Sequence, residues 1–522
     1  MKKTIPIKAL LLGAILLVVS CNQDIMNYPD PNTFNTSNYF NTPAEIRQAS
    51  TAAYISFYFN SMGGFEWSEM FDVLAAEAEA TPEALPNEPH IAQLYSYTHN
   101  NTSGSISDIW KMLYRMILRS NLTIDMAQAY IDKNGDDANH IVSMSQGEGY
   151  FLRGYAYTQL AFYFGRVPMR TSFNQAGNED APRSATVDIV WAQAENDLKD
   201  AQELLPDVWD TENTGRATKG SATGFLGKLY LYNKKYNEAD AEFAKLEGKY
   251  NLLPLEQYMD NFGETNENNQ ESIFEFQFAF KPGMFLYAGG AFGDGPEGHT
   301  VAGTVNGIPM LFGWNDWANW KFPSRRVADF IYDDESGVSY IDPRAQYTFY
   351  GGIGDSTWQD NMPTGPIKFD FATLGYWYKK MTNKENKETE GTLESGNNIR
   401  LMRYADVLLM RAECKLFTGD IPGCIGYINQ VRSRVGAFPY QASYTQEQAF
   451  ELLKRDRQLE LMGEYSRFND LKRWGILKEV MNVEMMALFG TQPVTDKHYL
   501  FPIPQSEIDS NLGLGEVANG WN

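Results

Sequence analysis

The chain has 522 residues, a formal net charge of −22 at pH 7, and a composition that is 43% hydrophobic and 14% aromatic. These values describe a globular protein with enough apolar residues for a large core. The acidic balance makes nucleic acid a poor partner, because binding it requires a net basic face. Polyanionic glycans are disfavoured more weakly, since a local basic patch can coexist with an acidic surface.

The N-terminus predicts a cleaved signal followed by a lipid anchor. Three lysines precede the apolar run 9–19, which is too short to span a bilayer and is typical of a signal peptide. The run ends in VVSC at Cys21, and small residues before a cysteine resemble a bacterial lipobox. We predict a signal peptide over 1–20 and a lipidated Cys21 that opens a polar tether over 21–41. An ordinary secretory signal with an incidental cysteine is the alternative.

Helical periodicity dominates the chain from Thr42 to about residue 250. Thr42 predicts a helix cap, and Pro43 after it fits the first helical position. Apolar spacing predicts further helices over 105–131, 150–164 and 187–205. The helix over 150–164 is apolar nearly all round, which is typical of a buried helix. Within it, Gly154 would admit a closely packed neighbouring helix, and Gly165 with Pro168 ends it.

Residues 222–246 contain the clearest repeat pattern. Large and small residues follow the tetratricopeptide spacing at Leu226, Gly227, Tyr230, Tyr236, Ala239, Phe243 and Leu246. Gly227 and Ala239 are the small residues expected where two antiparallel helices cross. The same twelve-residue spacing of small residues recurs at Ala412 and Cys424. We predict a mostly α fold with about four helix pairs, over 43–131, 147–205, 218–248 and 403–435.

Between residues 251 and 398 the composition changes, and Gly, Pro, Asn and aromatic residues dominate. Residues 272–280 alternate like a short strand, 324–332 keep a helical period, and Ile367, Tyr376 and Tyr378 suggest short extended pieces. Such loop-rich stretches usually form functional surfaces. We therefore divide the mature chain into a tetratricopeptide-like scaffold (42–250), a loop-rich ligand-binding region (251–398) and a C-terminal helical scaffold (399–522).

Seven motifs in order resemble those of the SusD/RagB family, the nutrient-binding outer-membrane lipoproteins of Bacteroidetes-type bacteria. They are the lipobox Cys21, 147–169, Asp342-Pro343-Arg344, 399–413, Asn429-Gln430-Val431-Arg432, 455–475 and 501–508. The resemblance implies a tetratricopeptide-like scaffold with an irregular ligand-binding half. It also implies a lid role over a SusC-like TonB-dependent transporter, attachment to the outer membrane through the lipid anchor, and an oligosaccharide ligand. The RagB branch is associated with peptides.

Loop tryptophans are the candidate ligand-binding residues. An aromatic ring can bury the apolar C–H face of a sugar while loop amides and carboxylates meet its hydroxyls. The candidates are Trp67, Trp314, Trp317 and Trp320 with the neighbouring Asn315 and Asp316; Tyr287, Phe292 and Trp358 form a second rank. The alternative is that the tryptophan triplet packs a loop onto the scaffold. Trp110, Trp191 and Trp474 lie in amphipathic helices and are predicted to be core residues.

Charged residues in apolar helices predict structural ion pairs rather than a catalytic site. One set is Arg403, Asp406, Arg411 and Glu413, predicted to share a helix, and another lies within 455–473. A glycosidase needs two facing carboxylates, and no pair is singled out by spacing. Asp72, Glu77 and Glu79 lie near the aromatic segment 65–71, but a solvated face accounts for them equally well.

Other chemistry has little support in the sequence. The five histidines are scattered without metal-ligand spacing, and no hydrolase, Walker or dinucleotide motif occurs. Cys414 and Cys424 are predicted to be small buried hydrophobes rather than a disulfide. We expect no cofactor, although the Asp- and Asn-rich loops leave a structural calcium ion open.

The sequence therefore predicts a non-enzymatic, lipid-anchored surface protein that captures an oligosaccharide for a TonB-dependent transporter. Three alternatives remain at this point: capture of a peptide or glycopeptide, a lipid-anchored glycoside hydrolase, and a pure tetratricopeptide interaction module. The long aromatic loop region argues against the pure module, because repeats alone do not need it.

Overall fold

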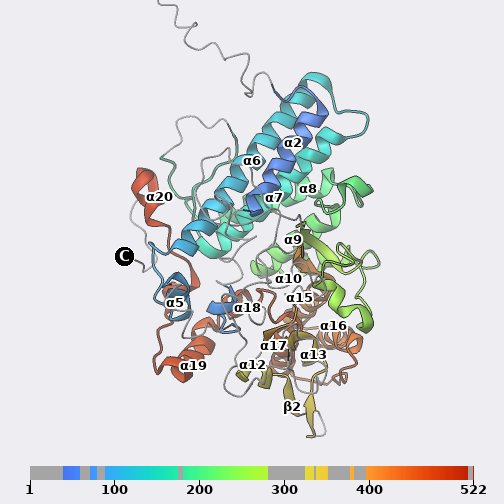
Figure 1. Ribbon diagram of the computed structural model, residues 1–522, viewed down its shortest axis with the longest axis vertical. Coiled ribbons are helices and arrows are strands. Elements are labelled where there is room, and N and C mark those ends of the chain that lie inside the picture. Colours follow the sequence, from blue (N-terminus) through green and yellow to red (C-terminus); the bar gives the residue numbers. More distant parts are fainter. Residues whose placement is uncertain are drawn as a thin grey trace, which may run out of the picture.

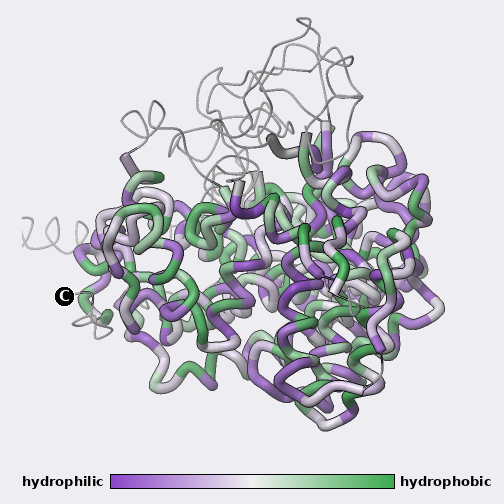
Figure 2. Tube along the Cα trace, turned by 90° about the horizontal axis from the view of Figure 1, so that it is seen from below, coloured by the Kyte–Doolittle hydropathy of each residue, from purple (hydrophilic) through white to green (hydrophobic). Residues whose placement is uncertain are grey.

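The computed structural model describes residues 39–58, 71–78, 89–173, 180–279, 324–333, 337–350, 377–380, 396–441, 443–514 and 521. Within these residues helices dominate, and the strands form three two-stranded sheets (Figure 1). The predicted mostly α fold is confirmed. Hydrophobic and hydrophilic residues alternate along the helices, as expected where each helix buries one face (Figure 2).

Four long helices lie together at one end of the molecule (Figure 1). They are α2 (Pro43–Tyr54), which continues into the 3-10 turn η2 (Ile55–Tyr58), α6 (Gly104–Asn134), α7 (Ile141–Phe164) and α8 (Val187–Leu204). The predicted start of α2 is confirmed, because Thr42 and Glu45 form a capping box around Pro43. The short helix α5 (Pro89–Tyr95) precedes α6.

Helix α7 is the buried centre of this group, as predicted. It begins at Ile141, earlier than predicted, because Asp137 accepts the Val142 N–H at 2.9 Å and caps the first turn. At Gly154 a Cβ atom would lie 2.9 Å from the Leu198 side chain of α8, so the two helices depend on the missing side chain. The helix ends at Gly165, which has a φ of 75°.

Two further helix pairs continue the frame. They are α9 (Lys219–Tyr232) with α10 (Tyr236–Ala244), and α15 (Tyr404–Phe417) with α16 (Ile421–Arg434). A Cβ atom at Gly227 would lie 2.5 Å from the Phe243 ring, which confirms Gly227 as a helix-crossing position. Cys414 and Cys424 are buried free thiols, as predicted. The four predicted helix pairs are thereby confirmed.

Short strands join distant parts of the chain. They form the antiparallel pairs β1 (Ser272–Phe276) with β6 (Ile399–Arg403), β2 (Ile331–Asp333) with β3 (Ser339–Ile341), and β4 (Phe349–Tyr350) with β5 (Trp377–Tyr378). The strands predicted from residue 272 and at Tyr378 are confirmed. The helix predicted over 324–332 is wrong at its end: α12 covers Ser324–Ala328, and Tyr332 pairs with Tyr340 in the β2–β3 hairpin.

The remaining elements lie in the C-terminal part, where the chain returns to its first helices. They are α13 (Ala345–Thr348), α17 (Gln446–Leu461), α18 (Arg467–Arg473), α19 (Leu477–Phe489) and α20 (Gln505–Ser510). The Phe501 N–H donates to the Tyr163 carbonyl at 2.7 Å, and the Gln505 N–H donates to the Asn101 carbonyl at 2.8 Å. The segment 501–508 therefore ties the end of the chain to α7 and to the start of α6.

A buried network of ion pairs holds the C-terminal helices to the strands. Arg403 contacts Glu271 and Glu460 at 2.8 Å and Glu464 at 2.7 Å. Arg344 joins it through Glu460 at 3.6 Å and also pairs with Asp342 and Asp456, each at 2.7 Å. The prediction of structural ion pairs is confirmed. One detail is wrong: Arg403 ends β6 rather than lying in a helix, because its backbone pairs opposite Ser272.

Candidate functional site

The predicted ligand-binding residues lie outside the described residues. This holds for Trp67, Tyr287, Trp314, Asn315, Asp316, Trp317 and Trp320, as well as for Phe292, Trp358 and the predicted lipidation site Cys21. These assignments therefore remain predictions. The structure does describe the residues on either side of the segments that carry Trp67 and the tryptophan triplet.

The described residues on either side of those two segments, here called their flanks, contact each other. Before the segments, Phe57 of η2 is in ring contact with Phe276 of β1. After them, the Arg325 guanidinium lies 3.5 Å from the Ala76 carbonyl oxygen. Residues more than 200 positions apart in the sequence thus lie side by side, both before and after the two segments.

Both pairs of flanks are fixed firmly to the helical frame. Phe71 stacks on Tyr163 of α7 with ring centroids 5.0 Å apart, and the Phe278 N–H donates to Asn398 Oδ1 at 2.7 Å. Phe71 is 1% exposed and Phe278 is 7% exposed. The anchor points of the predicted binding segments are therefore part of the core.

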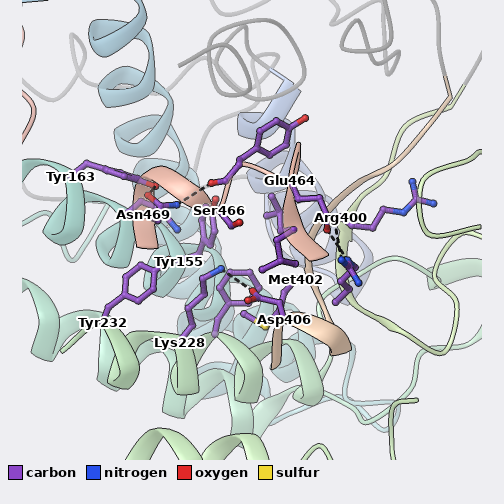
Figure 3. A pocket seen from close by; sticks show the side chains of 16 residues that line it. Tyr155, Tyr163, Lys228, Tyr232, Arg400, Met402, Asp406, Glu464, Ser466 and Asn469 are labelled. Atoms are coloured by element: carbon purple, nitrogen blue, oxygen red, sulfur yellow. Dashed lines mark hydrogen bonds and ion pairs between the residues drawn. The ribbon is translucent and has the colours of Figure 1, made fainter. Parts of the chain in front are cut away.

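A small cavity of about 60 Å³ lies next to these anchor points (Figure 3). Its walls come from α7, α9, β6, the start of α15 and the segment 461–469. Tyr155, Tyr163, Tyr232 and Lys228 lie on the side of α7 and α9, and Arg400 and Glu464 lie on the opposite side (Figure 3). Burial raises the pKa of Tyr155 and of Tyr163, so both rings stay neutral.

The charges around this cavity are already paired. Lys228 lies 3.5 Å from Asp406, and Arg457 contacts the same carboxylate at 3.0 Å (Figure 3). Burial alone would raise the pKa of Asp406, but Lys228 and Arg457 outweigh it and hold that pKa below its usual value. Glu464 is likewise engaged by Arg403 and by Lys380, at 2.7 and 2.8 Å.

The size and charge of the cavity exclude a role in glycan capture. A volume of this order holds a few water molecules, whereas ligand pockets span about 300–1,000 Å³. Asp406 and Glu464 are both held in ion pairs, and the lowered pKa of Asp406 means that this carboxylate is not held as a protonated acid. We therefore interpret the cavity as a hydrated part of the structural network.

Two acidic residues whose environment the sequence left open are buried close to Phe71 in the chain. Asp72 is fully buried and Glu77 is 1% exposed, so the solvated-face interpretation is wrong for both. The Gly463 N–H lies 3.4 Å from Glu77 Oε2, and Glu77 Oε1 has no hydrogen-bond partner among the described residues. Burial raises the pKa of Glu77 to about 7, although Arg467 and Arg326 act in the opposite direction.

Two of the scattered histidines meet in space. The rings of His99 and His498 lie 5.4 Å apart, and Trp521 packs against both. Burial lowers the pKa of His99 to about 3 and that of His498 to about 4, so both rings are neutral. Among the described residues, no group of three His, Cys, Asp or Glu side chains could hold a metal ion. The histidines therefore act in packing the C-terminus.

Two of the three predicted core tryptophans are less buried than expected. Trp110 is 2% exposed, which confirms the prediction, but Trp191 and Trp474 are only partly buried. Trp191 packs against the outside of the main core. Trp474 follows α18 directly and lines a separate cavity instead, because its ring rests on Phe450 at the edge of α17.

The described residues define the class of protein: a frame of stacked helix pairs joined by short two-stranded sheets. In the described part of the chain, no helix is both long and apolar enough to cross a membrane. Two family models match, described as "SusD family" over residues 310–521 and as "Starch-binding associating with outer membrane" over residues 34–231. The chain belongs to the SusD/RagB family.

Relatives align along almost the whole chain. SusD-like protein P25 of Formosa agariphila is 26% identical over 505 residues, which are 92% of this chain and 93% of that protein. A SusD superfamily protein from Bacteroides vulgatus superposes with a TM-score of 0.73 at 25% identity, covering 92% of this chain and 100% of that one. Surface glycan-binding protein A from Bacteroides thetaiotaomicron, solved with laminarihexaose, gives 0.72 at 20% identity, covering 91% and 99%. The helical frame is therefore that of the SusD structures.

Proposed function

We propose that this protein is a glycan-binding protein of the cell surface that captures an oligosaccharide and passes it to a TonB-dependent transporter of the outer membrane. The ligand rests on Trp67 and on at least one of Trp314, Trp317 and Trp320. Asn315, Asp316 and Tyr287 supply hydrogen bonds to its hydroxyls. The lipidated Cys21 holds the protein on the membrane. Capture and release by these groups requires no cofactor and no catalytic residue.

The observation that carries this proposal is the contact between the two pairs of flanks. Phe57 touches Phe276, and Arg325 reaches the backbone at Ala76. A single ligand can meet aromatic residues from both segments only if both start from the same part of the frame. The matched relatives support the ligand class, since one solved neighbour is described as a laminarin-binding SusD-like protein and another holds laminarihexaose.

Binding should be tested on the chain begun after Cys21, first on a glycan array and then by calorimetry with laminarihexaose and the best array ligands. Ala replacements of Trp67, Trp314, Trp317 and Trp320 are expected to weaken affinity while leaving the melting temperature nearly unchanged. Trp110→Ala is the matched control: this buried ring should cost about 3–5 kcal/mol of stability and leave the affinity of the remaining folded protein intact.

Two outcomes would contradict the platform assignment: a large loss of melting temperature in all four loop variants, or unchanged affinity in all four. Binding of peptides in place of glycans would favour the RagB-like alternative. Turnover of a labelled oligosaccharide would favour the hydrolase.

The anchor and the partner need a separate test in cells. Cys21→Ala should release the protein from the membrane fraction, and the wild-type protein should co-purify with a TonB-dependent transporter after gentle solubilisation. A variant that stays in the membrane at the wild-type level would remove the anchor assignment, and a preparation without any such transporter would count against the partner.

A further inference from the structure

A second cavity, of about 310 Å³, lies among the C-terminal helices. It is formed by α17, α18, the start of α19 and the residue Asp329 after α12. Its volume falls within the range of small-molecule pockets, and it is about five times that of the cavity in Figure 3. Its walls are built from helices and from the adjoining turns of the frame.

Three groups of this cavity have hydrogen-bond donors to spare. Arg467 is only 8% exposed, yet its Nε and Nη1 atoms have no hydrogen-bond partner in the described structure. The indole Nε1 of Trp474 is also buried without a partner there. Arg455 lies over the Tyr332 ring at 4.7 Å, and no carboxylate of the described residues pairs with it. Unpartnered buried donors are costly, so these groups favour a ligand that accepts hydrogen bonds.

The three carboxylates that line the same cavity are all engaged in ion pairs. Asp329 receives Arg326 at 2.9 Å and Gln458 at 2.6 Å. Asp470 is held at 2.7 Å by Arg457 and at 2.8 Å by the Arg473 guanidinium.

The one remaining carboxylate follows the same pattern, since Glu451 pairs with Lys454 at 2.7 Å. The free hydrogen-bonding capacity of the cavity is thus mainly that of donors, two of which are guanidinium groups.

The charge behind the cavity points the same way. Arg325, Arg326 and Arg467 all contact the single carboxylate of Glu484, Arg467 at the longer distance of 3.6 Å. Burial, with the repulsion of Arg326, lowers the pKa of Arg467 to about 10, although Glu77, Asp329 and Glu484 act in the opposite direction, so the group stays charged at neutral pH. Among the described residues its only ion pair is the long contact with Glu484. An anionic group placed against it would form charge-assisted hydrogen bonds.

From this geometry we infer that the cavity binds a uronic acid residue of a glycan, with its carboxylate toward Arg455 and Arg467 and its ring against Trp474. Arg455 comes from α17, whereas Arg467 and Trp474 come from the two ends of α18, which suits a compact ring with acceptors around its edge. The indole and the side chains of Leu471, Ile476 and Val480 supply the apolar surface that a sugar ring requires. A uronic acid carries its carboxylate and several hydroxyl groups on one rigid ring, whereas an acidic peptide side chain carries its carboxylate at the end of a flexible stem.

This site uses other residues than the predicted loop tryptophans and rests on the proposed function only in that the ligand is a glycan. The acidic net charge of −22 does not argue against it, because basic groups can gather locally on an acidic protein. Neutral glycans would use the loops, and acidic ones would gain a second contact on the frame.

The test uses the chain begun after Cys21 with three probes, glucuronic acid, glucose and glutamate, measured by ligand-observed NMR titration. Glucuronic acid is expected to bind at least tenfold more tightly than either of the other two. Arg455→Gln should weaken it at least tenfold without lowering the melting temperature, because Arg455 has no carboxylate partner to leave behind. Trp474→Phe, which keeps the ring but removes the N–H, should weaken it several-fold.

A matched control is Lys478→Gln, which removes an exposed charge of α19 outside the cavity and should leave glucuronic acid binding unchanged. Equal binding of glucose, or undiminished binding to Arg455→Gln, would overturn the site. Equal binding of glutamate would mean an acidic peptide site instead. A failure of the proposed tryptophan site would be seen separately. Trp314→Ala should weaken laminarihexaose binding if that site is correct, and it should leave glucuronic acid binding unchanged in either case.

Discussion

The crossing of α9 with α10 and the network around Arg403 are both fully buried, yet they are held by different physics. At the crossing, the missing side chain of Gly227 makes room for the Phe243 ring. In the network, Arg403 and Arg434 both contact Glu460, and Arg403 also reaches Glu271. The first region is specified by volume and the second by charge.

The difference follows from what each region joins. Two helices satisfy their own backbone groups and need only fit against each other. The network instead joins a strand end, a helix and loop residues, whose positions no helical period fixes. Directional charge-assisted bonds can fix such a junction, although buried pairs add little net stability over apolar packing. Each region should therefore respond to a different kind of substitution.

The largest effect is expected from removing the shared acid of the network with Glu460→Gln. Burial alone would raise the pKa of Glu460, but Arg434 and Arg403 outweigh it and hold that pKa low. The variant removes one of the two acids that Arg403 and Arg434 share, leaving Glu271 as the other, and this loss of buried negative charge should cost about 3–5 kcal/mol of unfolding free energy in a denaturant titration. The control is Asp496, which forms an exposed ion pair with Lys478. Asp496→Asn should change the free energy of unfolding by less than about 0.5 kcal/mol. A similar small change for Glu460→Gln would refute the charge-based account.

Glu77 offers a buried acid outside the network. Its folded pKa of about 7 exceeds the ordinary 4.5, so the folded state binds a proton more tightly than the unfolded state. This contribution to stability is complete below pH 4.5 and is lost as the pH rises to 7. Relative to wild type, Glu77→Gln should gain on the order of 3 kcal/mol over this interval. Unfolding titrations at pH 4.5 and 7.5 measure the gain, and a pH-independent difference would contradict it.

A smaller effect is expected at the volume-specified crossing. Gly227→Leu should overpack α9 against α10 and cost roughly 1–3 kcal/mol, with no dependence on pH or salt. Gly426 of α16 is the matched control, because a Cβ atom there meets nothing within 4 Å. Gly426→Ala should raise the melting temperature slightly, through a gain of about 0.5–1 kcal/mol in helix propensity. An unchanged midpoint in Gly227→Leu would remove the repeat assignment there.

Sequence reasoning succeeded where spacing along the chain carries the information. The helix pairs and the close approaches at Gly154 and Gly227 follow from periodicity, and burial of the 150–164 helix follows from its composition. It failed where the partner is remote: Glu77 is buried against Gly463, and His99 meets His498. No pattern in the neighbouring sequence predicts contacts between residues so far apart. Near Tyr332 a helical period was overridden by pairing with Tyr340, since three-residue strands leave almost no alternation to detect.

The return of the chain to its beginning has a consequence for the timing of folding. The carbonyl oxygens of Asn101 and Tyr163 accept hydrogen bonds from the backbone N–H groups of Gln505 and Phe501. His498 Nε2 lies 3.2 Å from the Tyr97 carbonyl oxygen. Until residues near 505 have been synthesised, these groups lack their native partners. Contacts of such long sequence separation are slow to form. A nascent chain therefore stays incompletely closed until residues near 505 have been made, and an incompletely closed polypeptide can still be threaded through a translocation pore.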